Sequence, residues 1–346
     1  MTSTTMESWK TMLGEFVAGL KSRSDDVREK TAHQLQQYVD TELREMNIDE
    51  YASFMNDLNH HIFEMVSGSE VHEKKGGVMA IMSLLGVDGG SSTKVNRFAN
   101  YLRHVLPCGD MIAMEMAAKT VGQLALSGGT FTAEYVEFEV KRSLEALQAD
   151  RIEGRRHAAV LILRELAVNA PTLFYQKVQP FFDNIFTAVR DPKQAIREGA
   201  VAALRACLVL TSQRESKDVR SSVSRRTWYQ QAYEEAEKGL SEQREKGSTL
   251  SRDDRTHGAL LIINELILNS NLESEFLEWD VDDIELQQQK PYLKALEDLS
   301  NSNSRPYEKF HHRQTTGSQS RLERGYSQLC REFMLSKFGE VRLKLT

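Results

Sequence analysis

The sequence predicts an all-α fold in which helix pairs stack into a solenoid, and three observations support this prediction. Very little of the chain alternates between apolar and polar residues, while much of it repeats with a period near 3.6. The 346 residues contain 6 Pro and 20 Gly, which is sparse for a sandwich or barrel of many short strands. Segments about 40 residues apart also share a common pattern, which is the signature of a repeat protein.

Taken in chain order, the periodicity gives six pairs of helices. The expected pairs are 12–22 with 25–45, 50–66 with 72–86, 94–106 with 110–126, 133–148 with 151–168, 172–189 with 192–210, and 228–239 with 253–270. In segment 155–169, the Ala, Leu and Ile residues cover a face too wide for a surface helix, so we expect packing on more than one side. Pro180 lies inside the run 172–189 and predicts a bend there.

Two internal registers support the repeat. At an offset of one hundred residues, eight of the fifteen positions in 155–169 are identical, including Arg155/Arg255 and His157/His257. At an offset of 41, Asp150, Arg156, Ala159 and Leu163 recur as Asp191, Arg197, Ala200 and Leu204. Two helices in a period of about 40–47 residues are typical of HEAT repeats. We therefore predict an α-solenoid of about six HEAT-type helix pairs, an armadillo-like superhelix; the alternative is a globular helical protein with accidental similarity.

The shared residues suit a structural role. An Asp just before a helix can accept hydrogen bonds from the free N–H groups of the first turn, and the pattern places four there: Asp110, Asp150, Asp191 and Asp253. The small residues let a second helix approach closely, at Gly77, Ala117, Ala159, Ala200 and Ala259. Such pairs cannot bury their apolar faces alone, and stacking builds a continuous core.

Composition and charge exclude several classes of protein. The net charge is −6, which argues against a nucleic-acid binder with a basic face. No apolar run approaches the roughly 18 residues that span a bilayer, and the polar start of the chain does not resemble a signal peptide. Cys108, Cys207 and Cys330 are far apart in sequence, so we expect a reduced, intracellular protein without disulfides.

The domain organisation follows from the same patterns. We expect a flexible N-terminus at 1–11 and a repeat solenoid at 12–271, with polar loops near 212–226 and 240–252. An acidic and then polar linker is expected at 272–321, and the start of a further helix at 322–346.

No catalytic, cofactor-binding or metal-binding residues are predicted. The Gly-rich stretch 86–90 lacks the spacing of a phosphate-binding loop and indicates an inter-helix turn. The pairs His60/His61 and His311/His312 have no carboxylate at metal-ligand spacing. His157 and His257 occupy equivalent repeat positions, which indicates a structural role, and Cys207 occupies a core position.

Longer segments resemble one family closely. These are GGVMAIMSLLGVDGG from Gly76, NRFANYLRHVLP from Asn96, GTFTAEYVEFEVKRSLEAL from Gly129, EGRRHAAVLILRELA from Glu153, VQPFFDNIFTAVRDPKQAIREGAVAALRACL from Val178 and DDRTHGALLIINEL from Asp253. They resemble the N-terminal HEAT region of the target of rapamycin (TOR) serine/threonine protein kinases, from about residue 13 to 271. The resemblance resumes faintly at 326–341. Family members are several-fold longer, and nothing here resembles their catalytic lobes, so we interpret the chain as a non-catalytic fragment or truncated product.

The resemblance implies a scaffold in TOR complex assembly and nutrient signalling. The implied partners are a Rheb-like small GTPase, a Raptor-like regulatory subunit and a Tel2-type chaperone adaptor. The implied location is the cytoplasm, the lysosomal surface through partners, and the nucleus, without direct membrane insertion. One alternative is a free-standing HEAT adaptor of the transport-receptor or phosphatase-scaffold type. The other is a serine/threonine protein kinase, which rests only on the activity of the parent protein, since its catalytic domain is absent from this chain.

One helix is a candidate for partner binding. The segment 94–106 has an apolar side and, opposite it, basic and aromatic residues. By the resemblance, Arg97, Asn100, Tyr101 and Arg103 are expected to face the small GTPase. The alternative is that they form an ordinary solvated outer face.

Overall fold

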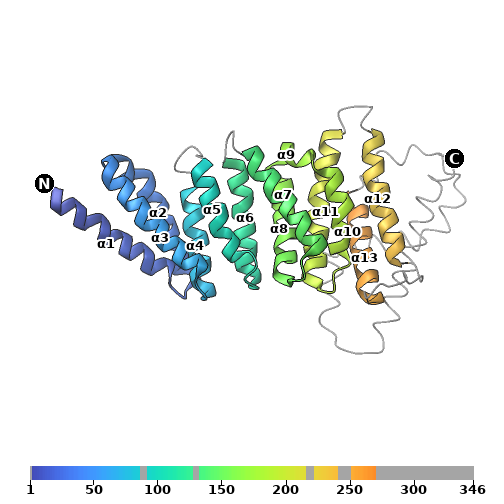
Figure 1. Ribbon diagram of the computed structural model, residues 1–346, viewed down its shortest axis with the longest axis horizontal. Coiled ribbons are helices and arrows are strands. Elements are labelled where there is room, and N and C mark those ends of the chain that lie inside the picture. Colours follow the sequence, from blue (N-terminus) through green and yellow to red (C-terminus); the bar gives the residue numbers. More distant parts are fainter. Residues whose placement is uncertain (1, 86–91, 128–131, 216–221, 241–250, 270–346) are drawn as a thin grey trace, which may run out of the picture. The chain divides into compact units, whose positions relative to one another are not determined.

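The computed structural model describes residues 2–85, 92–127, 132–215, 222–240 and 251–269, and every regular element in these ranges is an α-helix (Figure 1). The helices are α1 (Thr2–Leu20), α2 (Asp25–Glu45), α3 (Ile48–Ser67), α4 (Val71–Leu84), α5 (Ser92–Val105), α6 (Met111–Ser127), α7 (Thr132–Ala149), α8 (Glu153–Asn169), α9 (Pro171–Tyr175), α10 (Val178–Val189), α11 (Gln194–Glu215), α12 (Ser222–Leu240) and α13 (Arg252–Asn269). The predicted linker 272–321, the predicted helix 322–346 and the Gly-rich stretch 86–90 lie outside the described residues.

The chain divides into two units, residues 1–225 and 226–346. In the first unit, consecutive helices form five pairs, with α9 as a short extra turn before α10 (Figure 1). The second members of the pairs pack in series, α2 on α4, α4 on α6, α6 on α8 and α8 on α11, and we call them the B layer. The first members, α1, α3, α5, α7 and α10, form the A layer. Two layers of sequentially stacked helices make the predicted α-solenoid, and the fold class is confirmed.

Small residues set the spacing of the layers, as predicted. Ala117, Ala159 and Ala200 are fully or almost fully buried in successive B helices. At Gly77, a Cβ atom would come within 2.7 Å of the Val66 side chain on α3, so only glycine allows this approach of α3 and α4. In the second unit, α12 and α13 meet in the same way, since a Cβ on Gly239 would lie 2.8 Å from that of Ala259.

The predicted Asp caps are only partly correct. Asp110 caps α6, because its Oδ1 accepts a hydrogen bond from the backbone N–H of Ala113 at 2.8 Å. This bond and, to a lesser degree, the nearby Lys75 ammonium hold the pKa of the Asp110 carboxyl below its usual value, against the opposing effect of burial. Asp253 lies inside α13 instead, and the hydroxyl of Ser251 accepts from its backbone N–H at 3.2 Å.

Asp150 and Asp191 stabilise the turn before the helix rather than its first turn. Each accepts a hydrogen bond at 2.9 Å from the N–H two residues later, and each helix begins three residues later. An arginine near the start of each helix completes the turn. Arg156 donates to the carbonyl of Asp150 at 3.2 Å, and Arg197 donates to that of Asp191 at 2.7 Å. Each arginine side chain is therefore hydrogen-bonded to the turn that precedes its own helix.

The same arginine also joins neighbouring repeats. Arg156 on α8 reaches the carboxylate of Asp191, in the turn before α11, with Nε–Oδ2 at 2.6 Å and Nη2–Oδ1 at 3.3 Å. Asp191 is 5% exposed. Hydrogen bonding to Asp191 is the main cause that raises the pKa of the Arg156 guanidinium. Arg156 and Asp191, from two successive repeats, thus form a largely buried link between neighbouring repeats.

Three boundaries differ from the sequence prediction. Helix α1 begins at Thr2, not at residue 12, because Trp9 continues the apolar face and is 3% exposed. The chain breaks at Gln176–Lys177 between α9 and α10 instead of bending, since Pro180 lacks an N–H and its ring crowds the carbonyl four residues earlier. Helix α11 continues to Glu215 and α12 begins at Ser222, so helix occupies most of the expected polar loop 212–226.

The buried histidine should give a pH-dependent stability. His157 is 8% exposed at the start of α8, and burial is the main cause that lowers the pKa of its imidazole. The unfolded chain takes up the proton as the pH falls through about 6.5, before the folded chain does, so the free energy of unfolding should decrease there. We expect His157→Gln to flatten the decrease measured by urea unfolding between pH 7.5 and 5.5.

The exposed His33 on α2 supplies the control for this prediction. His33→Gln should leave the decrease in stability between pH 7.5 and 5.5 as steep as in the natural chain. An equally steep slope in the His157→Gln variant would contradict the assignment. The carboxyl groups with shifted pKa values, such as that of Asp110, are shifted downwards and so away from this pH range.

Candidate protein-interaction surface

Helix α5 has one buried face, so its polar residues lie on the opposite, outer face. Val95, Phe98, Leu102 and Val105 are all at most 3% exposed and recur every three or four residues. The residues between them therefore face outwards from the A layer. Arg97, Asn100 and His104 are exposed, while Tyr101 and Arg103 are half-buried.

Tyr101 belongs to an aromatic cluster that joins α5 to α3. Its ring centroid lies 5.2 Å from that of Phe63, at an interplanar angle of 47°. The His104 ring meets the edge of Phe63 at 5.6 Å and 85°. Phe63 is 40% exposed, so the cluster presents apolar surface to solvent instead of burying it.

Arg103 reaches in the opposite direction, to α7. Its Nη2 lies 2.6 Å from Oε1 of Glu139, and its guanidinium carbon lies 5.0 Å from the ring centroid of Phe138. Nη1 also donates to Oδ1 of Asn100. The Glu139 side chain is 2% exposed and binds Arg142 as well, at 2.7 Å. Arg103 is therefore an inter-repeat link, and only part of its side chain is open to a partner.

The structure thus places the four predicted residues on one helix but gives them unequal roles. Arg97 and Asn100 are exposed to solvent, although Asn100 also accepts a hydrogen bond from Arg103. Tyr101 packs against Phe63, and Arg103 is paired with Glu139. The sequence analysis missed the two neighbouring aromatic residues, Phe63 and Phe138. The sequence did hold a signal for Phe138, because it lies outside the apolar spacing of Val136, Val140 and Leu144. In the structure its side chain is 52% exposed.

We name this surface the α3–α5–α7 face. It consists of Phe63, Arg97, Asn100, Tyr101, Arg103, His104 and Phe138. Exposed aromatic residues beside arginine are the groups enriched at protein interfaces and their energetic centres. The face spans three consecutive repeats, so its chemistry suits protein binding.

The described residues offer no feature of a metal site. No group of three or more His, Cys, Asp or Glu side chains gathers in them at metal-binding distances. Among these same ranges, no helix has both the length and the apolar character that crossing a membrane requires.

Comparison with known proteins identifies the family. No family model matches the chain. The chain is 42% identical over 271 residues to the serine/threonine-protein kinase mTor of Drosophila melanogaster, an alignment that covers 76% of this chain. It is 44% identical over 204 residues to the serine/threonine-protein kinase tor1 of Schizosaccharomyces pombe, covering 59% of this chain. This chain belongs to the TOR family. It spans about a tenth of the length of these TOR relatives, at 11% and 9%.

The part of TOR that matches is a helical-repeat segment and not a kinase domain. Solved structures give weaker likenesses. A chain from a structure of Kap95p with RanGDP covers 99% of this chain at a TM-score of 0.44 and 14% identity, with 39% of that chain aligned. A designed armadillo repeat protein gives a TM-score of 0.32 at 12% identity, with 73% of this chain and 99% of that chain aligned. Neither likeness bears on what the TOR segment binds.

Proposed function

We propose that this TOR segment is a non-catalytic scaffold that contributes to TOR complex assembly and regulation in nutrient and growth signalling. The observation that carries the proposal is the α3–α5–α7 face, where partly exposed Phe63 and Phe138 flank the polar residues of α5. A solenoid suits this work because each repeat adds surface without enlarging the core. Membership of the TOR family supports the choice of complex.

We assign the α3–α5–α7 face to a Rheb-like small GTPase. Tyr101 and Phe63 supply a rigid apolar contact, and Arg97 supplies a positive charge next to it. A Raptor-like subunit and a Tel2-type chaperone adaptor are proposed to use other surfaces of the solenoid. The proposed location is the cytoplasm and, through partners, the lysosomal surface and the nucleus.

Charge reversal at Arg97 tests this assignment. Arg97 is exposed, so Arg97→Glu should leave folding intact and weaken GTPase binding about tenfold, which corresponds to about 1.4 kcal/mol. Phe63→Ala with Tyr101→Ala should weaken it further, because both rings leave the face. Binding of the purified chain to a Rheb-like GTPase, loaded with GDP or a GTP analogue, can be measured by calorimetry.

The control variant is Arg44→Glu, which reverses another exposed charge, on α2; the Arg44 side chain is 67% exposed. Arg103 is unsuitable, since a glutamate there would face the buried Glu139 carboxylate and disturb the fold. Unchanged binding by Arg97→Glu, or an equal loss with Arg44→Glu, would contradict the assignment.

A further inference from the structure

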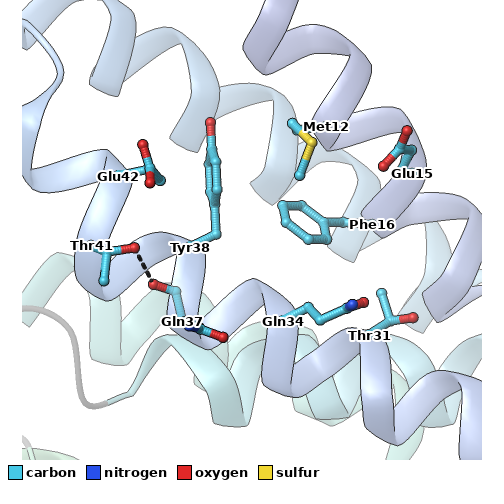
Figure 2. Close-up of a pocket in the computed structure, with 9 residues that line it drawn as sticks. All are labelled: Met12, Glu15, Phe16, Thr31, Gln34, Gln37, Tyr38, Thr41 and Glu42. Carbon is cyan, nitrogen blue, oxygen red and sulfur yellow. Dashed lines mark hydrogen bonds between the residues drawn. The ribbon is translucent and has the colours of Figure 1, made fainter.

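A groove lies between the first two helices, away from the α3–α5–α7 face. It is a cavity of about 300 Å³ that opens to solvent between α1 and α2 (Figure 2). Helix α1 contributes Met12, Glu15 and Phe16 to its walls, and α2 contributes Gln34, Tyr38 and Glu42. The size matches the lower end of known ligand pockets, so a few side chains of a partner would fill it.

In the apolar part of the groove, the Tyr38 ring is held in place by two buried phenylalanines. The Tyr38 ring lies 5.4 Å from that of Phe16 and 5.6 Å from that of Phe54, which is fully buried. In Figure 2 the Tyr38 ring stands between Glu42 on one side and Met12 and Phe16 on the other. Phe16 is itself only 4% exposed and packs against the Tyr38 ring, so a long side chain entering here would meet the Tyr38 ring and the Met12 thioether.

The polar part of the groove is acidic. Glu15 and Glu42 lie at opposite ends of the pocket, one from each helix (Figure 2). No cation of the described residues lies within ion-pairing distance of either carboxylate. Burial and, after it, the charge of Glu42 raise the pKa of the Tyr38 phenol, so its hydroxyl stays protonated and can donate.

This combination selects a cationic occupant. Lysine and arginine bury their methylene stems on apolar surface and keep the charge at the polar edge, which is the order of surfaces found here. The aromatic face of Tyr38 adds a cation–π attraction. A phosphate-bearing ligand would meet two carboxylates, and a second copy of this groove would oppose like charges.

We propose that the α1–α2 groove binds a basic segment of a protein partner, seating one Lys or Arg stem on Met12 and Tyr38 with its charge between Glu15 and Glu42. The groove does not share residues with the α3–α5–α7 face, so it adds a second contact to the scaffold. The proposal holds or fails independently of GTPase binding.

Peptide titration with a methyl probe at Met12 tests the proposal. The probe is a synthetic amphipathic helix with leucines on one face and lysines beside them, added to the full chain with its methionine methyls isotopically labelled. We expect the Met12 methyl resonance to shift saturably. Glu15→Gln with Glu42→Gln should weaken binding roughly three- to tenfold, the effect of removing exposed charge pairs.

The matched control is Glu29→Gln with Glu45→Gln, which removes the same charge from exposed positions of α2 outside the groove. This variant should bind the lysine peptide as the natural chain does. Equal weakening by both variants would mean that net charge alone drives binding and would overturn the proposal. Peptide binding that saturates without shifting the Met12 methyl resonance would also overturn it, as would equal binding of a peptide with glutamate in place of lysine. A third contrary result is self-association of the chain that the Glu15/Glu42 variant abolishes.

Discussion

Replacing Gly76 by alanine should strongly destabilise the start of the solenoid, although the change adds only one methyl group. A Cβ atom at this position of α4 would overlap the backbone carbonyl oxygen of Leu20, at the end of α1. A backbone oxygen cannot rotate aside, so α1 must move away from α4 and open the fully buried contacts of Leu20 and Val78. We expect Gly76→Ala to lower the free energy of unfolding by about 2–3 kcal/mol.

Urea unfolding followed by circular dichroism measures this effect, and hydrogen exchange shows whether α1 and α4 are the helices affected. The control is Gly14→Ala, a glycine in the same α1 helix with open space around its Cβ position. That variant should be stabilised by up to about 1 kcal/mol, because alanine favours the helix. The close approach of α1 and α4 would be refuted by equal stability of the two variants.

The second large effect is expected at the buried link between repeats. Asp191→Ala removes the carboxylate that binds Arg156 at 2.6 Å and leaves a guanidinium that is only 18% exposed without its counter-charge. It also removes the acceptor for the backbone N–H of Lys193. Breaking a buried ion pair costs about 3–5 kcal/mol, and we expect the lower end of this range because Arg156 keeps some contact with solvent.

The exposed pair Lys177–Glu137 has the same 2.6 Å separation, with a Glu137 side chain that is 64% exposed. Glu137→Ala should therefore leave the urea unfolding transition where it is, which isolates burial as the cause. In the double variant Asp191→Ala with Arg156→Met, part of the lost stability should return, since no buried charge remains. A double variant less stable than Asp191→Ala alone would argue against the link.

The sequence was sufficient for the fold because the repeat pattern is local. The range 25–45 predicted for the second helix is the range of α2, since its apolar positions recur at helical spacing and the helix has two acidic residues in its first turn. The small residues at Gly77, Ala159 and Ala200 were correctly interpreted as contact points between helices. Periodicity specifies which face is buried, and stacking follows from it.

The rest depended on contacts between residues far apart in the chain. Nothing in the sequence around Arg103 indicates that Glu139, 36 residues later, is buried beneath it. The misplaced Asp caps have a local cause instead, because Arg156 and Arg197 each donate to the carbonyl six residues earlier and close a turn before the helix. Whether Arg97, Asn100, Tyr101 and Arg103 contact a GTPase stays a prediction.

The link from Arg156 to Asp191 has a consequence for how such a chain can change in length. The guanidinium ties its own repeat to the next one and leaves more distant repeats untouched. Loss of this link should therefore lower the stability of the two repeats that it joins and have little effect on more distant repeats. Because the Arg156–Asp191 pair involves two adjacent repeats alone, adding or removing a complete repeat elsewhere in the solenoid should leave this pair intact.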